Sequence, residues 1–346
     1  MVLEHEVEVG LNELDRRLEK VRDVFEEMNI LITGGCGFIG SWMCDLLIRW
    51  GSNILCIDNL STGKIDYIDH LMKTGRFKLI NKPVEKVKEV EFRPDVVIHM
   101  AARASPEDYM MHPVETILAN TLGTYNMLEI ARKHDAIFLF TSTSEVYGDP
   151  EDEYIPTPEK YWGRVNPIGP RSCYDESKRL SEAMCMAYHR EYSLDVRITR
   201  IFNSYGPRLR WDGAYARVIP RFIYQALMGQ PITVHGDGSQ TRSFTYIVDT
   251  IEAHILVMTD NRARGEVFNI GNNREISILE LARIIKELTK SSSEIVFKPQ
   301  RPDDPKRRCP DISKIVNMLG WKPRTELREG LMLTISWIKS HLTASH

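Results

Sequence analysis

The chain has little of what marks several classes of protein. Six of its 346 residues are cysteine and no C-x-x-C pair occurs, which argues against a disulfide framework or zinc site and favours buried, reduced thiols. No apolar run approaches the roughly 18 residues of a membrane span, and the acidic N-terminus lacks the apolar segment of a secretory signal. A formal net charge of −3 supplies no positive field for nucleic acid. We therefore expect a soluble, cytoplasmic protein without a membrane, nucleic-acid or metal partner.

Residues 1–27 differ in composition from the remainder. They carry a net charge of −5, so the remaining chain carries +2. Apolar residues recur there at steps of three and four, at Leu11, Leu14, Leu18, Val21 and Phe25. That spacing predicts an appended amphipathic helix. Three alternatives stay open for it: docking on its own domain, a solvated extension, or self-association.

From residue 28 to about residue 203, short apolar runs alternate with helical patterns. The runs that predict strands are 29–33, 53–58, 95–102, 136–143 and 195–203, and helices are expected over 41–50 and 113–134. Alternation at this spacing predicts an α/β fold with a Rossmann-type, doubly wound parallel sheet.

Beyond residue 204 the elements become shorter and the loops richer in Gly and Pro. We expect helices over 218–229 and 277–288 and strands near 232–236 and 267–272, with a charged, proline-broken loop at 301–308. The predicted organisation is an appended helix (1–27), a dinucleotide-binding domain (28–203) and a smaller C-terminal α/β lobe (204–346) with some interleaving into the first domain.

A glycine-rich turn follows the first predicted strand. Gly34, Gly37 and Gly40 permit a tight turn, close approach of the backbone to a pyrophosphate, and a helix N-terminus aimed at the phosphates. Asp58 ends the second strand, where a carboxylate accepts hydrogen bonds from a ribose diol and repels a 2′-phosphate. NAD is therefore favoured, although Lys64 leaves NADP open. The predicted cofactor residues are Gly34, Gly37, Phe38, Ile39, Gly40, Asp58, Asn59, Ser61, Thr62, Gly63, Ala101, Ala102, Arg103, Thr141, Tyr174 and Lys178.

Tyr174 and Lys178 lie four residues apart, on one face of a predicted helix. A tyrosine base near neutral pH needs its pKa lowered by roughly three units, which a neighbouring ammonium and a cationic nicotinamide ring favour. Thr141, Ser142, Thr143 and Ser144 lie at the carboxyl end of a predicted strand, where a hydroxyl can relay a proton between a substrate alcohol and Tyr174. Glu145 follows closely, and is read either as an active-site carboxylate or as a surface carboxylate that begins a loop.

Five segments together resemble a known family. They are TSTSEVYGDPE (141–151), YWGRVNPIGPRSCYDESKRLSE (161–182), RIFNSYGPR (200–208), GDGSQTRSFTYIVD (236–249) and DDPKRRCPDI (303–312). Over residues 28–340 the chain resembles the extended short-chain dehydrogenases/reductases that act on nucleotide sugars. Within them it resembles the UDP-glucuronate decarboxylases, because Ser144-Glu145 follows Thr143, whereas related 4,6-dehydratases usually carry Asp-Glu and simple 4-epimerases usually lack the Glu.

The resemblance implies a closed redox cycle on a UDP-sugar. NAD takes hydride from carbon 4 of UDP-glucuronate while Tyr174, assisted by Thr143, removes the hydroxyl proton. The resulting β-keto acid loses carbon dioxide with help from Glu145 and Ser144, and reduction of the ketone gives UDP-xylose. A 4,6-dehydratase or 4-epimerase reaction stays open. The resemblance also implies a homodimer, for which helices 115–134 and 174–192 would supply the interface.

Substrate residues are likewise carried over from the resemblance. Arg242 matches an arginine that faces the sugar carboxylate, although pairing with the diphosphate or with a protein acid is the alternative. Asn203 is either a diphosphate contact or a cap on its strand end. The predicted substrate-binding residues are Thr143, Asn203, Arg217, Val218, Arg242 and Arg308.

The chain departs from the family pattern at several places. Residues 81–84 (NKPV) stand where an Asp-Val pair usually contacts adenine, and Arg103 replaces a small residue. We expect Arg103 either to contact a cofactor phosphate or to adapt the site to a different sugar. The loop 209–216 (LRWDGAYA) differs in length from the pattern, and the helix at 1–27 has no counterpart in it.

Overall fold

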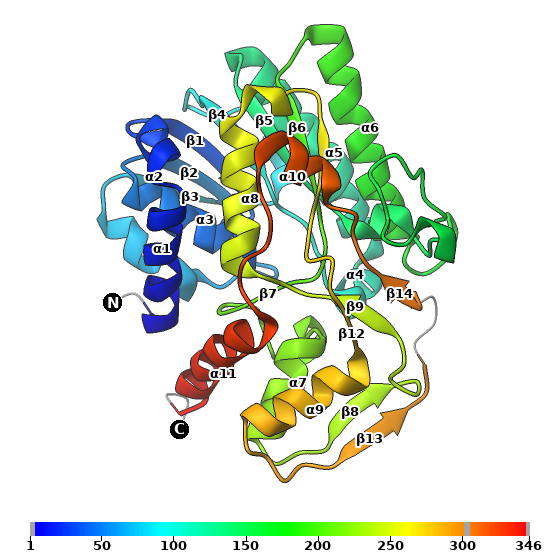
Figure 1. Ribbon diagram of the computed structural model, residues 1–346. Coiled ribbons are helices and arrows are strands. Elements are labelled where there is room, and N and C mark those ends of the chain that lie inside the picture. Colours follow the sequence, from blue (N-terminus) through cyan, green and yellow to red (C-terminus); the bar gives the residue numbers. More distant parts are fainter. Residues whose placement is uncertain (1–3, 301–304, 344–346) are drawn as a thin grey trace.

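The computed structural model describes residues 4–300 and 305–343 and is built around one parallel sheet (Figure 1). The sheet has seven strands in the order β11-β6-β5-β4-β1-β2-β3. Their bounds are β1 Asn29–Thr33, β2 Asn53–Asp58, β3 Phe77–Asn81, β4 Val96–His99, β5 Ile137–Thr143, β6 Val196–Ile201 and β11 Val267–Ile270. All six pairings are parallel. The predicted doubly wound α/β fold is confirmed.

Alternate residues of each strand pack into two hydrophobic core layers, one on each face of the sheet. Ile30 and Ile32 of β1 pack with α1 (His5–Arg17), α3 (Phe38–Arg49) and α8 (Ile247–Thr259) on one face. Leu31 packs with α5 (Pro113–His134) and α6 (Ser172–Tyr192) on the other face. Because successive side chains of a strand point to opposite faces, a run of consecutive apolar residues is what a sheet covered on both sides requires.

The C-terminal half contributes to both parts of the molecule. Strand β11 pairs with β6 in the central sheet rather than in the smaller lobe, and α10 (Ser313–Leu319) packs against it. Helix α8 covers the central sheet, and most of the remaining elements of this half form the lobe in the lower part of Figure 1. Its elements are α7 Val218–Leu227, β8 Ile232–His235, β9 Thr241–Ser243, β12 Glu275–Ser277, α9 Ile278–Leu288, β13 Ile295–Lys298, β14 Arg307–Arg308 and α11 Leu327–Thr343. The two strands β7 (Ser204–Tyr205) and β10 (Thr245–Tyr246) pair between the two parts. Of the predicted loop 301–308, residues 301–304 lie outside the described residues.

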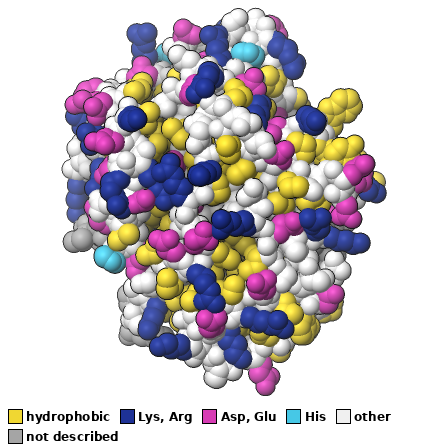
Figure 2. All heavy atoms as spheres, viewed as in Figure 1, with side chains coloured by type: hydrophobic (Ala, Val, Ile, Leu, Met, Phe, Trp, Pro, Cys, Tyr) yellow, Lys and Arg dark blue, Asp and Glu magenta, His cyan; other side chains and the backbone are white. Residues whose placement is uncertain are grey.

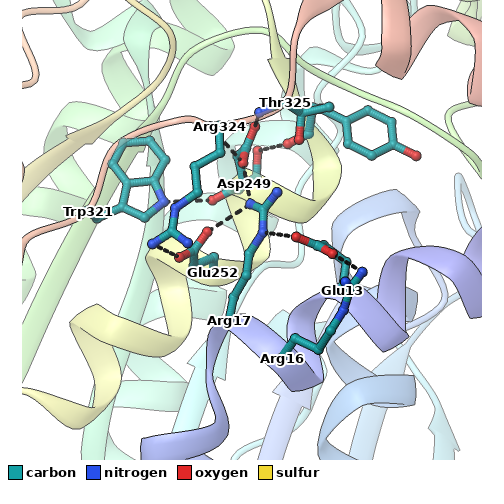
Figure 3. A network of polar contacts seen from close by, with 10 residues as sticks. Glu13, Arg16, Arg17, Asp249, Glu252, Trp321, Arg324 and Thr325 are labelled. Atoms are coloured by element: carbon teal, nitrogen blue, oxygen red, sulfur yellow. Dashed lines mark hydrogen bonds and ion pairs between the residues drawn. The ribbon is translucent and has the colours of Figure 1, made fainter.

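The N-terminal segment docks on its own chain. Helix α1 ends at Arg17, and α2 (Glu19–Arg22) with one further turn carries the chain to β1. Helix α1 contacts α3, α8 and α11, and buries Leu11 and Leu14 completely. Figure 3 shows how Arg17 reaches α8, where its guanidinium lies 2.6 Å from Asp249 Oδ1 and 3.0 Å from Glu252 Oε2. Of the three alternatives for this helix, the structure has the docked one, which uses its apolar face within the chain.

Other expectations concern composition. All six cysteines are buried and none is in a disulfide. In the described part of the chain, no helix has both the length and the apolar character needed to cross a membrane. Acidic and basic side chains are interspersed over the face seen in Figure 2.

Candidate active site

A cavity of about 540 Å³ lies at the carboxyl edge of the central sheet. This is where open α/β sheets bind their ligands, since the loops that follow neighbouring parallel strands converge there. Most of the predicted cofactor residues line it, namely Gly34, Gly37, Phe38, Ile39, Gly40, Asp58, Asn59, Ser61, Thr62, Ala101, Ala102, Arg103, Thr141, Tyr174 and Lys178. Of the predicted substrate residues, Thr143, Asn203 and Arg217 line it as well. The structure does not place Gly63, Ser144, Glu145, Val218, Arg242 or Arg308 in this wall.

The glycine-rich turn explains why the cavity can accept phosphates. Gly34 has φ +75°, which favours glycine, and a Cβ added to Gly40 would lie 2.1 Å from the carbonyl oxygen of Gly34. Helix α3 begins at Phe38, directly after this turn. The free N–H groups and the positive dipole end of that helix are therefore available to a pyrophosphate in the cavity.

Asp58 ends β2 and lines the cavity beside the glycine turn. Its carboxylate accepts hydrogen bonds from Cys36 N at 2.9 Å and Leu60 N at 2.8 Å, while burial raises its pKa. The two backbone bonds fix the orientation of the carboxylate at the cavity wall. Lys64, the residue that left NADP open, lies 3.9 Å from Asp212 Oδ1, so part of its charge is offset within the chain.

Tyr174, Thr143 and Lys178 form the opposite part of the cavity wall. The Thr143 side chain at the end of β5 lies close enough to the Tyr174 hydroxyl in the first turn of α6 to lower the pKa of that phenol. Lys178 Nζ donates to the carbonyl oxygen of Thr141 at 2.9 Å, and burial lowers its pKa to about 8. A hydroxyl, a phenol and an ammonium thus share one buried corner.

The pKa of Tyr174 differs from the sequence-based expectation. Burial raises it to about 12, although the nearby charge of Arg217 and the hydrogen bond from Thr143 act in the opposite direction. The chain by itself therefore keeps Tyr174 as a neutral phenol. The reason is desolvation, which disfavours any charged group in a buried corner. Lowering this pKa requires positive charge in the cavity, as a bound cationic nicotinamide ring would provide.

Glu145 is held between two arginines just beyond the cavity wall. It accepts hydrogen bonds from Arg171 at the start of α6 and from Arg308 on β14, and its side chain is 17% exposed. Burial opposes its charged form, but the guanidinium groups of Arg308 and Arg171 outweigh burial and lower its pKa. Glu145 is therefore a largely buried carboxylate next to Thr143, and not a surface carboxylate that begins a loop.

Three residues near Glu145 were absent from the sequence-based set. Arg171 is the residue before α6 and Asp175 follows Tyr174 within it, and burial together with the charge of Glu145 raises the pKa of Asp175. The Tyr109 ring stacks on the Tyr174 ring at 5.0 Å with an interplanar angle of 1°. The proximity of Arg171 to Asp175 could have been found, because residues four apart share a helix face. Tyr109 could not, since 65 positions separate it from its partner.

The predicted substrate residues other than Thr143 lie on elements of the smaller lobe or next to them, or are bonded to them. Arg242 on β9 and Arg308 on β14 are register partners in neighbouring parallel strands. Asn203 donates from Nδ2 to the carbonyl oxygen of Ser243 at 3.0 Å, so it ties the end of β6 to the strand that carries Arg242. Arg217 is the residue before α7 and donates to the carbonyl oxygen of Ala104 at 2.5 Å; Val218 begins that helix.

Two departures from the family pattern also have definite positions. Arg103 binds Asp108 through two bonds of 2.8 and 3.0 Å and Glu115 at 2.9 Å, so its guanidinium is already held by carboxylates. Residues 82–85 line the cavity. Among residues 4–300 and 305–343, no group of three or more His, Cys, Asp and Glu side chains is placed to hold a metal ion.

Comparison with known proteins gives consistent matches. The family model of GDP-mannose 4,6-dehydratase matches residues 31–334. UDP-glucuronic acid decarboxylase 1 of Arabidopsis thaliana is 45% identical over 92% of this chain and 71% of its own length. UDP-glucuronic acid decarboxylase 6 of the same plant is 47% identical over 88% of this chain and 87% of its own length.

A solved structure supports the same placement. The UDP-glucuronic acid 4-epimerase of Bacillus cereus, in complex with UDP-glucuronic acid and NAD, superposes with a TM-score of 0.81. It is 30% identical, and the match covers 91% of this chain and all of that one. The chain therefore belongs to the GDP-mannose 4,6-dehydratase family, within the extended short-chain dehydrogenases/reductases, and is similar there to the UDP-glucuronic acid decarboxylases.

Proposed function

We propose that the protein converts UDP-glucuronate to UDP-xylose and carbon dioxide with NAD as a recycled cofactor. The observation that carries this proposal is the position of Glu145. It is a largely buried, arginine-held carboxylate two residues after Thr143, and Thr143 lines the cavity together with Tyr174. The similarity to UDP-glucuronic acid decarboxylases over most of the chain supports the same reaction.

The residues that line the cavity fit NAD. A Cβ at Gly40 would lie 2.1 Å from the Gly34 carbonyl oxygen, so only glycine allows the start of α3 to pack this closely against the turn. Asp58 stands where a ribose diol would be bound, and Lys178 lies within the wall near Tyr174. Bound NAD would supply a hydride acceptor beside the sugar and a positive ring that favours the Tyr174 phenolate.

The chain's own residues then divide the proton chemistry. Tyr174 takes the proton of the 4-hydroxyl group, and Thr143 bridges the sugar and the phenol. A ketone at carbon 4 makes the sugar acid a β-keto acid, so loss of its carboxylate as carbon dioxide leaves an enolate. Carbon 5 of the enolate takes a proton from solvent, and we propose that Glu145 and Ser144 assist the delivery of this proton. Return of the hydride from the reduced cofactor and of the proton from Tyr174 would then restore the 4-hydroxyl group. Arg242 is proposed to bind the sugar carboxylate, and Asn203, Arg217, Val218 and Arg308 to border the nucleotide diphosphate.

A second candidate reaction is 4-epimerisation of the same substrate. The Bacillus cereus relative is named for that activity, and its fold matches closely. The two reactions differ in whether the carboxylate leaves. We take Glu145 to favour decarboxylation, because a simple inversion at carbon 4 needs no additional carboxylate near the site.

Product analysis separates these alternatives. We expect incubation with UDP-glucuronate to yield UDP-xylose and carbon dioxide, identified by mass spectrometry. A uronic acid product with an inverted carbon 4 would establish the epimerase instead. A keto-sugar formed from UDP-glucose, dTDP-glucose or GDP-mannose would establish a dehydratase.

We also propose that the protein is a cytoplasmic homodimer. Helices α5 and α6 pack side by side, and α5 carries a stripe of exposed apolar side chains. These are Val114, Ile117, Leu118, Leu122 and Tyr125, between 40 and 67% exposed. Their spacing places them on one helix face, which a second copy related by a two-fold axis would cover. The buried, unpaired cysteines suit a reducing compartment.

Substitution on this stripe tests the dimer. Leu118→Glu places a charge at the centre of the proposed interface, so we expect a monomer in size-exclusion chromatography with light scattering, where the wild-type protein is a dimer. Met332→Glu is the matched control, because Met332 is an exposed apolar residue (53%) on α11, away from the stripe. A monomeric wild-type protein, or a dimeric Leu118→Glu variant, would contradict the proposal.

A further inference from the structure

Residues 208–215, which we term the strap, form part of the cavity wall. Arg208, Leu209, Arg210 and Tyr215 all line the cavity. The strap also reaches across to the turn that carries Ser61 and Thr62. Arg210 Nη1 donates to the carbonyl oxygen of Thr62 at 3.1 Å, and the Tyr215 hydroxyl to that of Ser61 at 3.3 Å. Residues 209–215 of the strap fall within the loop that departs in length from the family pattern, whereas Arg208 ends a segment that follows the pattern.

Arg208 anchors one end of the strap. Arg208 is 1% exposed, and its guanidinium donates to Glu4 Oε2 at 2.8 Å and to Asp45 Oδ2 at 2.7 Å. Its φ of +71° is uncommon for a residue with a side chain, and such a conformation persists only where the surroundings hold it. The two carboxylates thus compensate the buried charge of Arg208 and hold its backbone in this uncommon conformation.

Glu4 belongs to the N-terminal extension, outside the stretch that the family model matches. It is the residue before α1, and it also accepts a hydrogen bond from Trp337 Nε1 at 3.0 Å and lies 3.4 Å from His341 Nε2 on α11. Burial opposes its charge, but His341 and Arg208 outweigh burial and lower its pKa to about 2. Figure 1 shows α1 and α11 on the same side of the molecule, close to both termini.

We propose that Glu4 is a positioning residue for cofactor retention, which holds the strap closed over the cavity through Arg208. Without the Glu4 charge, Asp45 remains as a carboxylate partner of Arg208, and Asp45 also binds His70 Nε2 at 2.7 Å. A buried arginine that loses one of its two carboxylate partners is less stable in its buried position. The strap then opens more often, and the dinucleotide leaves faster. This inference rests on the proposed function in one respect, namely that the cavity holds NAD.

The first test compares two variants of the same N-terminal segment. Glu4→Gln keeps the shape of the side chain and removes its charge, so we expect bound NAD to dissociate about tenfold faster, a change of about 1.4 kcal/mol. Arg17→Gln is the matched control, because Arg17 anchors α1 to Asp249 and Glu252, outside the cavity wall. We expect Arg17→Gln to lower Tm while NAD dissociates at the wild-type rate. Equal NAD rates for Glu4→Gln and wild type, or rates that follow Tm in both variants, would overturn the inference.

The second test needs no substitution. Because binding free energies are coupled reciprocally, NAD bound under a closed strap must also stabilise the anchor. We expect NAD to slow hydrogen exchange in residues 4–10 as well as in the strap of the wild-type protein. Protection of the glycine turn alone would overturn the inference, whereas a wild-type protein that binds no NAD at all would overturn the proposed function instead.

Discussion

Replacing Tyr174 with phenylalanine is expected to lower turnover of UDP-glucuronate by about a thousandfold, within the range that general acid–base groups contribute. The hydroxyl that Thr143 contacts is lost, while the ring keeps its stacking on Tyr109. NAD should remain bound, because the glycine turn and Asp58 are unchanged. The measurement is the initial rate of carbon dioxide release, together with the NAD content of the purified variant.

Tyr188→Phe is the matched control for this effect. Tyr188 lies on the same helix, and its hydroxyl donates to Glu129 Oε1 at 2.6 Å, outside the cavity wall. We expect its rate to stay within about twofold of wild type, as for most substitutions that avoid a site's chemistry. A Tyr174→Phe variant that keeps a tenth or more of the wild-type rate would show that the phenol is not the base.

The second large effect is expected at Glu145. Glu145→Gln removes the carboxylate that Arg171 and Arg308 share, so it removes the group proposed to assist protonation of carbon 5. It also leaves two largely buried guanidinium groups without this counter-ion. We expect the rate of carbon dioxide release to fall by at least about a hundredfold. The Tm should fall as well, because leaving buried charges uncompensated is costly.

A neighbouring ion pair provides the comparison. Glu275 pairs with Arg307, the residue before Arg308, and its side chain is 21% exposed, close to that of Glu145. Glu275→Gln should therefore disturb the same small sheet and yet keep most of the activity. Similar losses of rate in the two variants would indicate that Glu145 acts through the sheet and not on the sugar.

Most of the fold could be predicted from patterns that lie within single segments of the sequence. The run NILIT and the helix from Pro113 to His134 have the predicted bounds, because apolar periodicity and a proline start are properties of the segment itself. The glycine turn and Asp58 could be placed together for the same reason, since one strand–turn–helix unit contains almost all of that geometry.

Long-range pairings were beyond the same reasoning. Glu145 and Arg308 are 163 positions apart, and nothing in either segment specifies that they meet. Strand β11 likewise joins the edge of the central sheet next to β6, although it follows elements of the smaller lobe. The raised pKa of Tyr174 arises from desolvation, which depends on every neighbour of the ring and not on the Tyr-Lys spacing.

We propose that one site oxidises carbon 4, releases the carboxylate and then reduces carbon 4 again. UDP-glucuronate that carries deuterium at carbon 4, incubated with the protein as purified, reports on all three steps. We expect UDP-xylose with the deuterium still at carbon 4 and one solvent proton at carbon 5. A product that retains its carboxyl group, or one that has lost the label, would contradict it.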